Sequence, residues 1–412
     1  MKIAESYKKT IELLNPWWAG IEVELGVERA NYLSRVDEVL AKRQQILFIL
    51  GSRRVGKTRI LLQSIYRLIK NGVEPKKILL LSLDNSNLEN LDWYNYITDS
   101  GCQYIFLDEV HYAPKWAQIL KSLYDIPGRN YKIVCSGSSS RLIEDNKAFL
   151  TGRSTSLLVT PLDFAEFPQF SQAEDLIRDY LFYGGYPEFV LEREPNYLNE
   201  LLRDVVEKDI VKSHKVKNSQ YLYDVCQILA KQIGFKSSAN KIAHILRLDN
   251  KTVENYIQYL KEVRLIDVVY QYSPSLNQRL YSPKKYYFND LGMRNSFVGF
   301  SDMGSLVENA VWLRLTKIYG VNNVFYLNDF RANEVDFVVT IDRNKIILVE
   351  SKYNNLQSAV INSLPGLFFK EIYDKKIVDR IVITDGIDEI FQKNNLKIKL
   401  VSLKNFLTLW QQ

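Results

Sequence analysis

The feature that constrains this chain most is an octapeptide with two glycines, placed between a short apolar run and a segment with helical spacing. It reads Gly51-Ser52-Arg53-Arg54-Val55-Gly56-Lys57-Thr58. Residues 45–50 form the apolar run before it, and residues 59–69 follow with apolar side chains three and four positions apart. This order predicts a buried parallel strand, a loop and a helix, and therefore an α/β sheet.

The octapeptide has the pattern of a phosphate-binding loop, the Walker A motif. Its glycines let successive backbone N–H groups surround phosphate oxygens at the N-terminal end of the helix. Lys57 places its charge near the β- and γ-phosphates, and the Thr58 hydroxyl is a ligand for Mg²⁺. We therefore predict that the eight residues bind ATP together with Mg²⁺. The alternative, a chance match in a glycine-rich turn, is disfavoured by the flanking strand and helix.

A pair of acids follows a second apolar run. Residues 103–107 lead directly into Asp108-Glu109, which places both carboxylates at the carboxyl end of a buried strand, where ligands bind in open α/β sheets. We predict that Asp108 holds Mg²⁺, directly or through water, and that Glu109 orients or deprotonates the attacking water. His111 is interpreted as a structural neighbour. The alternative is an exposed acidic loop start.

Two further segments fit the same sheet. Residues 77–84 and 131–140 each contain a strand pattern, and the second ends in a polar cluster that includes Ser138. Ser138 suits a sensor contact to the γ-phosphate, although serines are equally common in ordinary loops. Arg153 is a candidate arginine finger, for this loop or for that of a neighbouring copy in a homo-oligomer. The alternative for Arg153 is a plain surface arginine.

The middle of the chain is patterned as helices. Paired glycines and a proline within residues 184–187 mark a turn between two of them. Residues 221–270 predict three helices and the start of a β-hairpin, the order of a winged helix-turn-helix. The side chains expected to face DNA are Lys251, Asn255 and Gln258 on the third helix and Arg279, Lys284 and Lys285 on the wing. Because Glu254 and Glu262 also lie on that helix, a packing module beside the ATPase is an equal alternative.

Residues 333–353 predict a hairpin that carries acids near its open end. Residues 342–345 form the turn between its two strands. The first strand begins with Asp336, and alternation along the second places Glu350 and Lys352 on one face. We therefore expect these three side chains to lie close together.

An amphipathic helix over residues 306–313 would add Glu308 to this group. Carboxylates from adjacent strands chelate Mg²⁺ or Mn²⁺, and a nearby lysine activates water or stabilises the developing charge. This pattern resembles the PD-(D/E)XK nuclease core, which implies a restriction-endonuclease-like α/β domain. The alternatives are a nuclease-like fold without cleavage and an exposed acidic hairpin.

The composition is that of a globular protein with several domains. The chain has 412 residues, 46% of them apolar, and about two to four domains are expected. A net charge of +6 permits DNA or RNA as a partner without requiring it. No apolar run of about eighteen residues indicates a membrane span, and the N-terminus does not read as a signal peptide. The scattered Cys102, Cys135 and Cys226 indicate a reducing compartment, the cytoplasm.

Taken together, these motifs resemble those of a widespread prokaryotic family of AAA-type ATPases with a nuclease-like C-terminal domain of unknown function. The matching segments, in order, are Gly51 to Thr58, Leu107-Asp108-Glu109, Ser136 to Ser140, Gly152-Arg153 with Pro161-Leu162, Gly184 to Glu188, Glu334 to Phe337, and Glu350-Ser351-Lys352. Ser351 departs from the aliphatic residue usual in the family but leaves the acid and the lysine in place.

The resemblance implies a four-part α/β chain. Its parts are an AAA+-like parallel-sheet P-loop domain (1–170), a helical lid (171–215), a winged helix (216–295) and a nuclease-like domain (296–412). Three functions remain open: an ATPase that moves its C-terminal module, an ATP-gated nuclease that cleaves DNA or RNA with a second Mg²⁺ or Mn²⁺, and a regulatory switch whose nuclease-like domain is inactive.

Overall fold

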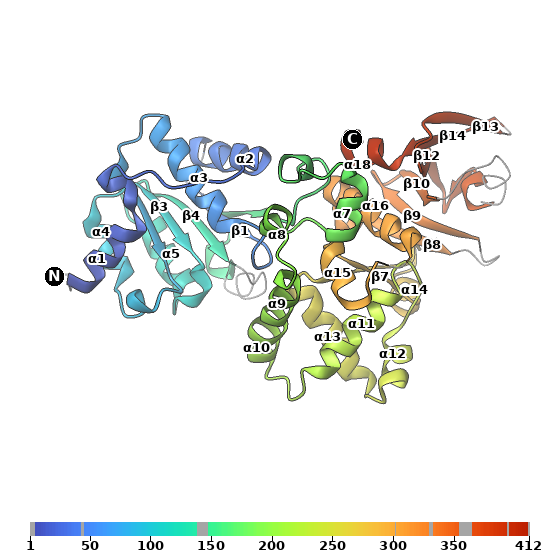
Figure 1. Ribbon diagram of the computed structural model, residues 1–412, viewed down its shortest axis with the longest axis horizontal. Coiled ribbons are helices and arrows are strands. Elements are labelled where there is room, and N and C mark those ends of the chain that lie inside the picture. The colour runs from blue at the N-terminus through green and yellow to red at the C-terminus, as the bar shows by residue number, and fades with distance from the viewer. Residues whose placement is uncertain are drawn as a thin grey trace. The chain divides into compact units, whose positions relative to one another are not determined.

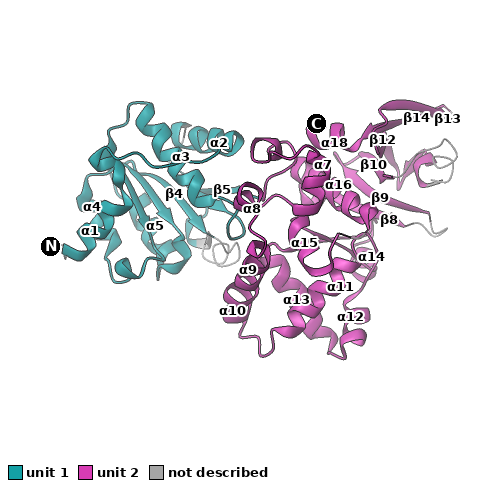
Figure 2. Ribbon diagram, in the orientation of Figure 1, with its two compact units in different colours: residues 1–160 teal, residues 161–412 magenta. Residues whose placement is uncertain are grey.

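The computed structural model describes most of the chain as two compact units. The residues described are 5–42, 45–137, 147–300, 302–328, 333–353, 365–393 and 395–410. Residues 1–160 form the first unit and residues 161–412 the second (Figure 2). Within the described residues, no helix has the length and apolar character needed to cross a membrane. The finer division at residues 171, 216 and 296 stays a prediction.

The first unit is built on a five-stranded sheet in which every pair is parallel (Figure 1). Its strands are β1 (Ile46–Leu50), β2 (Ile78–Ser82), β3 (Tyr104–Asp108), β4 (Lys132–Gly137) and β5 (Ser154–Leu158). They lie in the order β2-β3-β4-β1-β5. The short apolar runs of β1 to β4 are buried almost throughout, as expected for a parallel sheet covered on both faces. This confirms the parallel α/β fold predicted for this part of the chain.

Among the described residues of this unit, five α-helices accompany the sheet. They are α1 (Glu5–Leu14), α2 (Ala30–Lys42), α3 (Lys57–Lys70), α4 (Trp93–Ser100) and α5 (Trp116–Tyr124). Helix α3 packs against β3 and β4, and α1 packs against β2 at the edge of the sheet. The Asn15 amide protects this edge, because Nδ2 donates to Leu80 O at 2.9 Å and Leu80 N donates to Oδ1 at 2.7 Å.

The second unit begins with a run of helices. They are α7 (Leu176–Tyr183), α8 (Pro187–Glu192), α9 (Tyr197–Asp204), α10 (Lys212–His214), α11 (Gln220–Lys231), α12 (Ala239–Leu246) and α13 (Asn250–Glu262). Between α7 and α8, Gly184 adopts φ 71° and ψ −159°, a conformation open essentially to glycine alone. A Cβ on Gly185 would lie 2.2 Å from Leu162 O. The glycine pair therefore allows two backbone segments to approach closely.

Helices α11 to α13 precede a two-stranded antiparallel sheet made of β6 (Ile266–Val269) and β7 (Lys285–Phe288). The helices and the strand pair thus follow in the predicted order. The connection between the strands holds a further helix, α14 (Leu276–Tyr281), so Arg279 lies on a helix rather than on a strand of the expected wing. Sequence spacing did not reveal this helix because it is short and has no buried residue.

A mixed sheet forms the C-terminal part of the second unit (Figure 1). Its strands are β8 (Val324–Asn328), β9 (Glu334–Thr340), β10 (Lys345–Ser351), β11 (Glu371–Ile372), β12 (Lys375–Thr384), β13 (Glu389–Lys393) and β14 (Leu396–Ser402). The path is β13-β14-β12-β10-β9-β8, and β11 pairs with the start of β12. The predicted hairpin is β9 and β10, in which Val349 pairs with Phe337.

In this last part, the described residues form three α-helices. They are α15 (Leu291–Val298), α16 (Met303–Tyr319) and α18 (Leu403–Leu409). Helix α16 packs on β8, β9 and β10, while α18 packs on β12, β14 and α16. Helix α16 extends well beyond the predicted residues 306–313, and it brings Glu308 to the sheet.

Candidate functional site

The phosphate-binding loop lies between β1 and α3, as the sequence predicts. Gly56 precedes α3 with φ 95°, a left-handed conformation that glycine adopts at no steric cost. A Cβ on Gly51 would lie 2.3 Å from Val159 O, so this glycine is required where the loop leaves β1 close to the chain after β5. The glycine positions in the motif are therefore explained by backbone geometry.

The two polar residues that end the loop have defined partners. Lys57 is buried, with 4% of its side chain exposed, and its Nζ donates to Ser52 O at 2.9 Å. Thr58 Oγ1 donates to Asp108 Oδ2 at 2.7 Å. The loop at the end of β1 and the acid at the end of β3 thus meet through side chains that lie far apart in the sequence.

Asp108 is held by two hydroxyl groups. Ser136 Oγ donates a short hydrogen bond to its Oδ1, and Thr58 donates to its Oδ2. Burial raises the pKa of Asp108 above its usual value, while the two hydroxyl donors and Lys57 act in the opposite direction. Hydroxyl and carboxylate oxygens are the donors that Mg²⁺ prefers. Thr58 and Asp108 therefore fit the metal that accompanies ATP.

Glu109 lies beside this pair and faces the lysine of the loop. Its Oε1 is 3.8 Å from Lys57 Nζ, its backbone N–H donates to Ser136 Oγ at 3.0 Å, and its φ is 50°. Such a positive φ is uncommon for a residue other than glycine, and it occurs often at active sites. His111 Nδ1 lies 3.3 Å from Glu109 Oε2, so this histidine contacts the predicted water-orienting acid.

Sequence reasoning did not identify two other residues around this site. Ser136 belongs to a segment that carries the family resemblance, but sequence reasoning assigned it no role, whereas in the structure it contacts both Asp108 and Glu109. Arg29 is buried, and its Nη1 donates to Val55 O at 3.0 Å and to Thr160 O at 2.9 Å. It fixes the outer part of the loop from a segment whose sequence has no recognisable motif.

The two remaining predicted residues of this site are not brought to the loop by the structure. Ser138 lies outside the described residues. Arg153 precedes β5 at the end that pairs with Ile46, roughly 15 Å along the strand from the start of the loop. Its Nε donates to Asp125 Oδ1 at 2.9 Å. Within its own chain, Arg153 is thus placed away from the nucleotide site.

The predicted nuclease-like residues come together in the second unit. Asp336 on β9 accepts hydrogen bonds from Ser351 N at 2.9 Å and from Ser351 Oγ at 3.0 Å. Lys352 Nζ lies 3.4 Å from Glu350 Oε2. Glu308, on α16, is linked to Asp336 by a buried lysine, Lys285.

Lys285 corrects an expectation from the sequence. It was expected on an exposed wing, yet only 1% of its side chain is accessible. Its Nζ lies 2.9 Å from Glu334 Oε1, 3.1 Å from Glu308 Oε1 and 3.7 Å from Asp336 Oδ1. All four residues of β7 are buried, and Lys285 lies against acids of α16 and β9, so it cannot reach the phosphates of a nucleic acid.

The charged groups in this cluster shift one another's pKa values. Burial alone would lower the pKa of Lys285, but Glu308, Asp336 and Glu334 raise it above the usual value for lysine. Burial and the neighbouring Asp336 raise the pKa of Glu350 well above its usual range, and the two acids share a hydrogen bond. Although burial opposes it, the charges of Lys285 and Lys352 lower the pKa of Asp336. The proton of the pair therefore resides on Glu350.

These contacts bear on the expected second metal ion. Carboxylate oxygens suit Mg²⁺ or Mn²⁺, but the ammonium of Lys285 already lies among them. A Cβ on Gly234 would lie 2.5 Å from Glu308 Oε2, which shows how closely the chain covers this acid. In the part of the chain that the structure describes, no group of three or more His, Cys, Asp or Glu residues is arranged to hold a metal ion. A second metal in this domain is therefore not supported.

Three stretches of the chain match known family models. Residues 43–168 match an AAA domain. Residues 174–304 match a domain of unknown function, DUF8612, and residues 303–406 match another, DUF4143. None of these three matches describes a nuclease.

Similar proteins occur in archaea and bacteria. The chain is 28% identical over 355 residues to the uncharacterized protein MJ1544 of Methanocaldococcus jannaschii, covering 78% of each chain. It is 25% identical over 403 residues to an uncharacterized protein of Haemophilus influenzae, covering 89% of this chain and 99% of that one.

Solved structures with P-loop domains are also similar. AMPPCP-bound DnaA from Aquifex aeolicus has 16% identity and a TM-score of 0.30, covering 57% of this chain and 89% of that one. A DNA polymerase III gamma subunit-related protein of Thermotoga maritima has 13% identity and a TM-score of 0.29, covering 57% of this chain and 100% of that one. Likeness at this level carries no argument about function. The parallel sheet, the loop between β1 and α3 and the match over residues 43–168 identify this part of the chain as an AAA-type P-loop ATPase domain.

Proposed function

We propose that this protein is a Mg²⁺-dependent ATPase whose nucleotide state controls its second unit. One observation carries the proposal: Lys57, Thr58, Asp108 and Glu109 meet at the carboxyl ends of β1 and β3. These are the groups that hold a triphosphate and position a water molecule for attack on it.

Each residue has a separate role in the reaction. The backbone N–H groups of the loop and Lys57 bind the β- and γ-phosphates and stabilise charge on the transferred group. Thr58 and Asp108 would hold the metal, which when bound would neutralise negative charge on the phosphates. Glu109 accepts a hydrogen bond from the attacking water and takes its proton. His111, at 3.3 Å, helps to hold the Glu109 carboxylate in place.

The test separates binding from turnover. Glu109→Gln keeps the shape of the side chain but removes the base, so ATP should bind normally while hydrolysis falls by about 10² to 10⁴-fold. The matched control is Glu89→Gln, an exposed acid in the same unit, which should hydrolyse ATP at the wild-type rate. Wild-type turnover by Glu109→Gln would refute the role of this residue.

Cleavage of nucleic acid is the second candidate function, favoured by the approach of Asp336, Glu350 and Lys352 at the end of the β9–β10 hairpin. The burial of Lys285 among the same acids favours an inactive domain instead. A nicking assay with Mn²⁺ decides between them. Cleavage that is lost in Glu350→Gln would establish a nuclease, whereas no cleavage of single or double strands would support a domain that serves as a switch.

Helix α13 is a weak candidate for reading DNA. Lys251 Nζ lies 3.8 Å from Glu254 Oε2, and Gln258 Nε2 donates to Glu262 Oε1 at 3.1 Å. Lys251 and Gln258, two of the three side chains expected to face DNA, therefore contact acids of their own helix. We propose that α11 to α13 with β6 and β7 act as a winged helix that packs within the second unit.

A further inference from the structure

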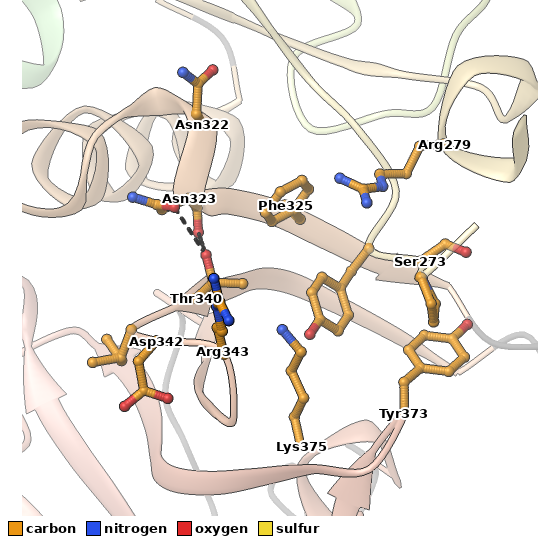
Figure 3. A pocket seen from close by; sticks show the side chains of 13 residues that line it. Ser273, Arg279, Asn322, Asn323, Phe325, Thr340, Asp342, Arg343, Tyr373 and Lys375 are labelled. Carbon is orange, nitrogen blue, oxygen red and sulfur yellow. Dashed lines mark hydrogen bonds between the residues drawn. The ribbon is translucent and has the colours of Figure 1, made fainter. Parts of the chain in front are cut away.

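A pocket of about 380 Å³ opens in the second unit, away from both sites described above (Figure 3). It lies between the segment after β6, helix α14, strand β8, the β9–β10 turn and the β11–β12 turn. Its lining combines three aromatic rings, Tyr272, Phe325 and Tyr373, with three cations, Arg279, Arg343 and Lys375. We call this group of six residues the basic aromatic pocket.

The aromatic rings form one connected surface. The ring centroids of Tyr272 and Phe325 are 5.6 Å apart, and those of Tyr272 and Tyr373 are 5.9 Å apart. Tyr373 remains 44% exposed although its ring is apolar. A flat apolar group in the pocket would therefore meet rings that water now contacts.

Two of the cations lie beside these rings. Arg279 Cζ lies 5.8 Å from the Phe325 centroid, and Lys375 Nζ lies 5.8 Å from the Tyr272 centroid. In Figure 3 the cationic groups of Arg279 and Lys375 both point toward the middle of the pocket. The one carboxylate of the lining, Asp342, accepts a hydrogen bond from Asn344 N at 2.8 Å and lies 3.5 Å from Lys345 Nζ. The pocket thus keeps an excess of positive charge.

Two buried polar atoms of the lining lack a partner. Tyr272 is 7% exposed, and neither its hydroxyl nor Arg279 Nε has a hydrogen-bond partner among the described residues. Buried polar groups in proteins are nearly always paired, so two unpaired ones beside a pocket indicate a ligand that supplies acceptors. Burial raises the pKa of Tyr272 to about 12, so its hydroxyl keeps its proton at neutral pH and can donate.

The backbone conformation at Tyr373 also favours a ligand-binding role for the pocket. Tyr373 and Asp374, with φ of 50° and 60°, are the two central residues of the hairpin turn between β11 and β12. Such turns normally carry asparagine and glycine, because a bulky side chain disfavours positive φ. The turn nevertheless holds an aromatic ring beside Tyr272.

We propose that the basic aromatic pocket binds a nucleotide of a single-stranded nucleic acid, with the base against the rings and the phosphate on the cations. Stacking on aromatic side chains and contact of phosphates with lysine and arginine are the two common means of single-strand binding. Two neighbouring hollows, of about 360 and 460 Å³, share Arg279 and Phe325 on one side and Tyr373 on the other. This continuity favours a strand over a free nucleotide.

The experiment uses the full chain carrying Lys57→Ala, so that nucleotides cannot bind at the phosphate-binding loop. Binding of a short fluorescein-labelled oligothymidylate is followed by anisotropy at low salt. Tyr373→Asn removes the ring but suits the positive φ, so the fold should be kept while affinity falls about tenfold. Tyr373→Phe should bind like the parent.

The cation is tested in the same way. Arg279→Ala should weaken binding and reduce its salt dependence. The matched control is Lys376→Ala, because this exposed lysine is next to Lys375 in sequence but does not line the pocket. Unchanged affinity in both Tyr373→Asn and Arg279→Ala would overturn the proposal.

Competitors identify the source of the ligand. Unlabelled oligothymidylate should displace the probe, and a duplex of the same length should not, because its bases are already stacked. Displacement by thymidine monophosphate at equal nucleotide concentration would support the nucleotide chemistry and assign the pocket to a free nucleotide. If the duplex displaced the probe as well as the single strand does, the proposed binding of a single-stranded nucleic acid would be refuted. Because ATP plays no part in these measurements, their failure leaves the proposed ATPase untouched.

Discussion

Both units of this protein bury a lysine beside carboxylates, and the partners of the two lysines differ. Lys57 donates to a backbone carbonyl, and its Nζ lies 3.8 Å from Glu109 Oε1. Lys285 lies within 3.7 Å of three acids, Glu308, Glu334 and Asp336. Lys57 thus lies at the phosphate-binding loop with Glu109 at the longer distance, whereas Lys285 is enclosed by three acids of its own unit. We therefore expect Lys57 to meet phosphate oxygens at the loop and Lys285 to act as a structural counter-ion for its acids.

The largest effect should follow from removing the first lysine. Lys57→Ala deletes the charge that meets the β- and γ-phosphates, so ATP hydrolysis should fall by about 10³-fold or more. A phosphate-release assay with a fluorescent ATP-binding measurement tests this. Lys70→Ala, at the far end of the same helix, is the control and should behave as wild type. If Lys57→Ala still hydrolysed ATP at the wild-type rate, Lys57 would not be the phosphate-binding lysine.

Removing the second lysine, Lys285, should destabilise the protein rather than remove an activity. Lys285→Met leaves buried acids without their counter-charge and should lower the free energy of unfolding by about 3 kcal/mol at neutral pH. Urea titration measures this, and the loss should shrink in acid as Glu308 takes up protons. Lys284→Met, at the neighbouring and more exposed position, should cost far less. If Lys285→Met were as stable as wild type, Lys285 would not be a structural counter-ion.

The next largest effect should come from Asp108, which with Thr58 is expected to hold Mg²⁺ in the first unit. Because burial raises the pKa of Asp108, its charge opposes folding above its ordinary titration range, and Asp108→Asn should leave the free protein near wild-type stability. At about one hundred times its dissociation constant, ATP with Mg²⁺ should stabilise the wild type by roughly 2.7 kcal/mol. Urea unfolding should show this gain disappear in the variant, and also in the wild type after EDTA treatment. A full gain in Asp108→Asn would contradict the metal assignment.

The smallest effect concerns the shared proton of the second unit. The folded-state pKa of Glu350 is raised, so its contribution to stability is complete below its unfolded pKa and is lost as pH rises toward the folded value. Glu350→Gln mimics the protonated acid and should reduce this decline in stability at neutral pH. Unfolding curves across pH test the difference. If added Mn²⁺ stabilised the wild type but not Glu350→Gln, these acids would be a metal site after all.

The sequence predictions were most accurate where a single short segment supplies all residues of a site. The loop from Gly51 to Thr58 places its phosphate-binding groups within eight consecutive residues. Gly56 is required by its local φ, whereas Gly51 is required by the close approach of Val159. Asp336, Glu350 and Lys352 were expected together because a single hairpin joins them. The partners contributed by other segments, such as Arg29, Ser136 and Lys285, were missed because no local pattern identifies them.

By itself, then, the sequence determined the parallel sheet, the phosphate-binding loop and the acids at the strand ends, since these follow from apolar periodicity and fixed spacing. The tertiary structure alone decided which charges are neutralised. It turned Lys285 inward onto three carboxylates, left Arg153 at the far end of β1 from the loop, and gathered five separate segments around the basic aromatic pocket. The physical reason is that electrostatic partners are set by distance in space and by burial, and neither can be read from positions along a chain.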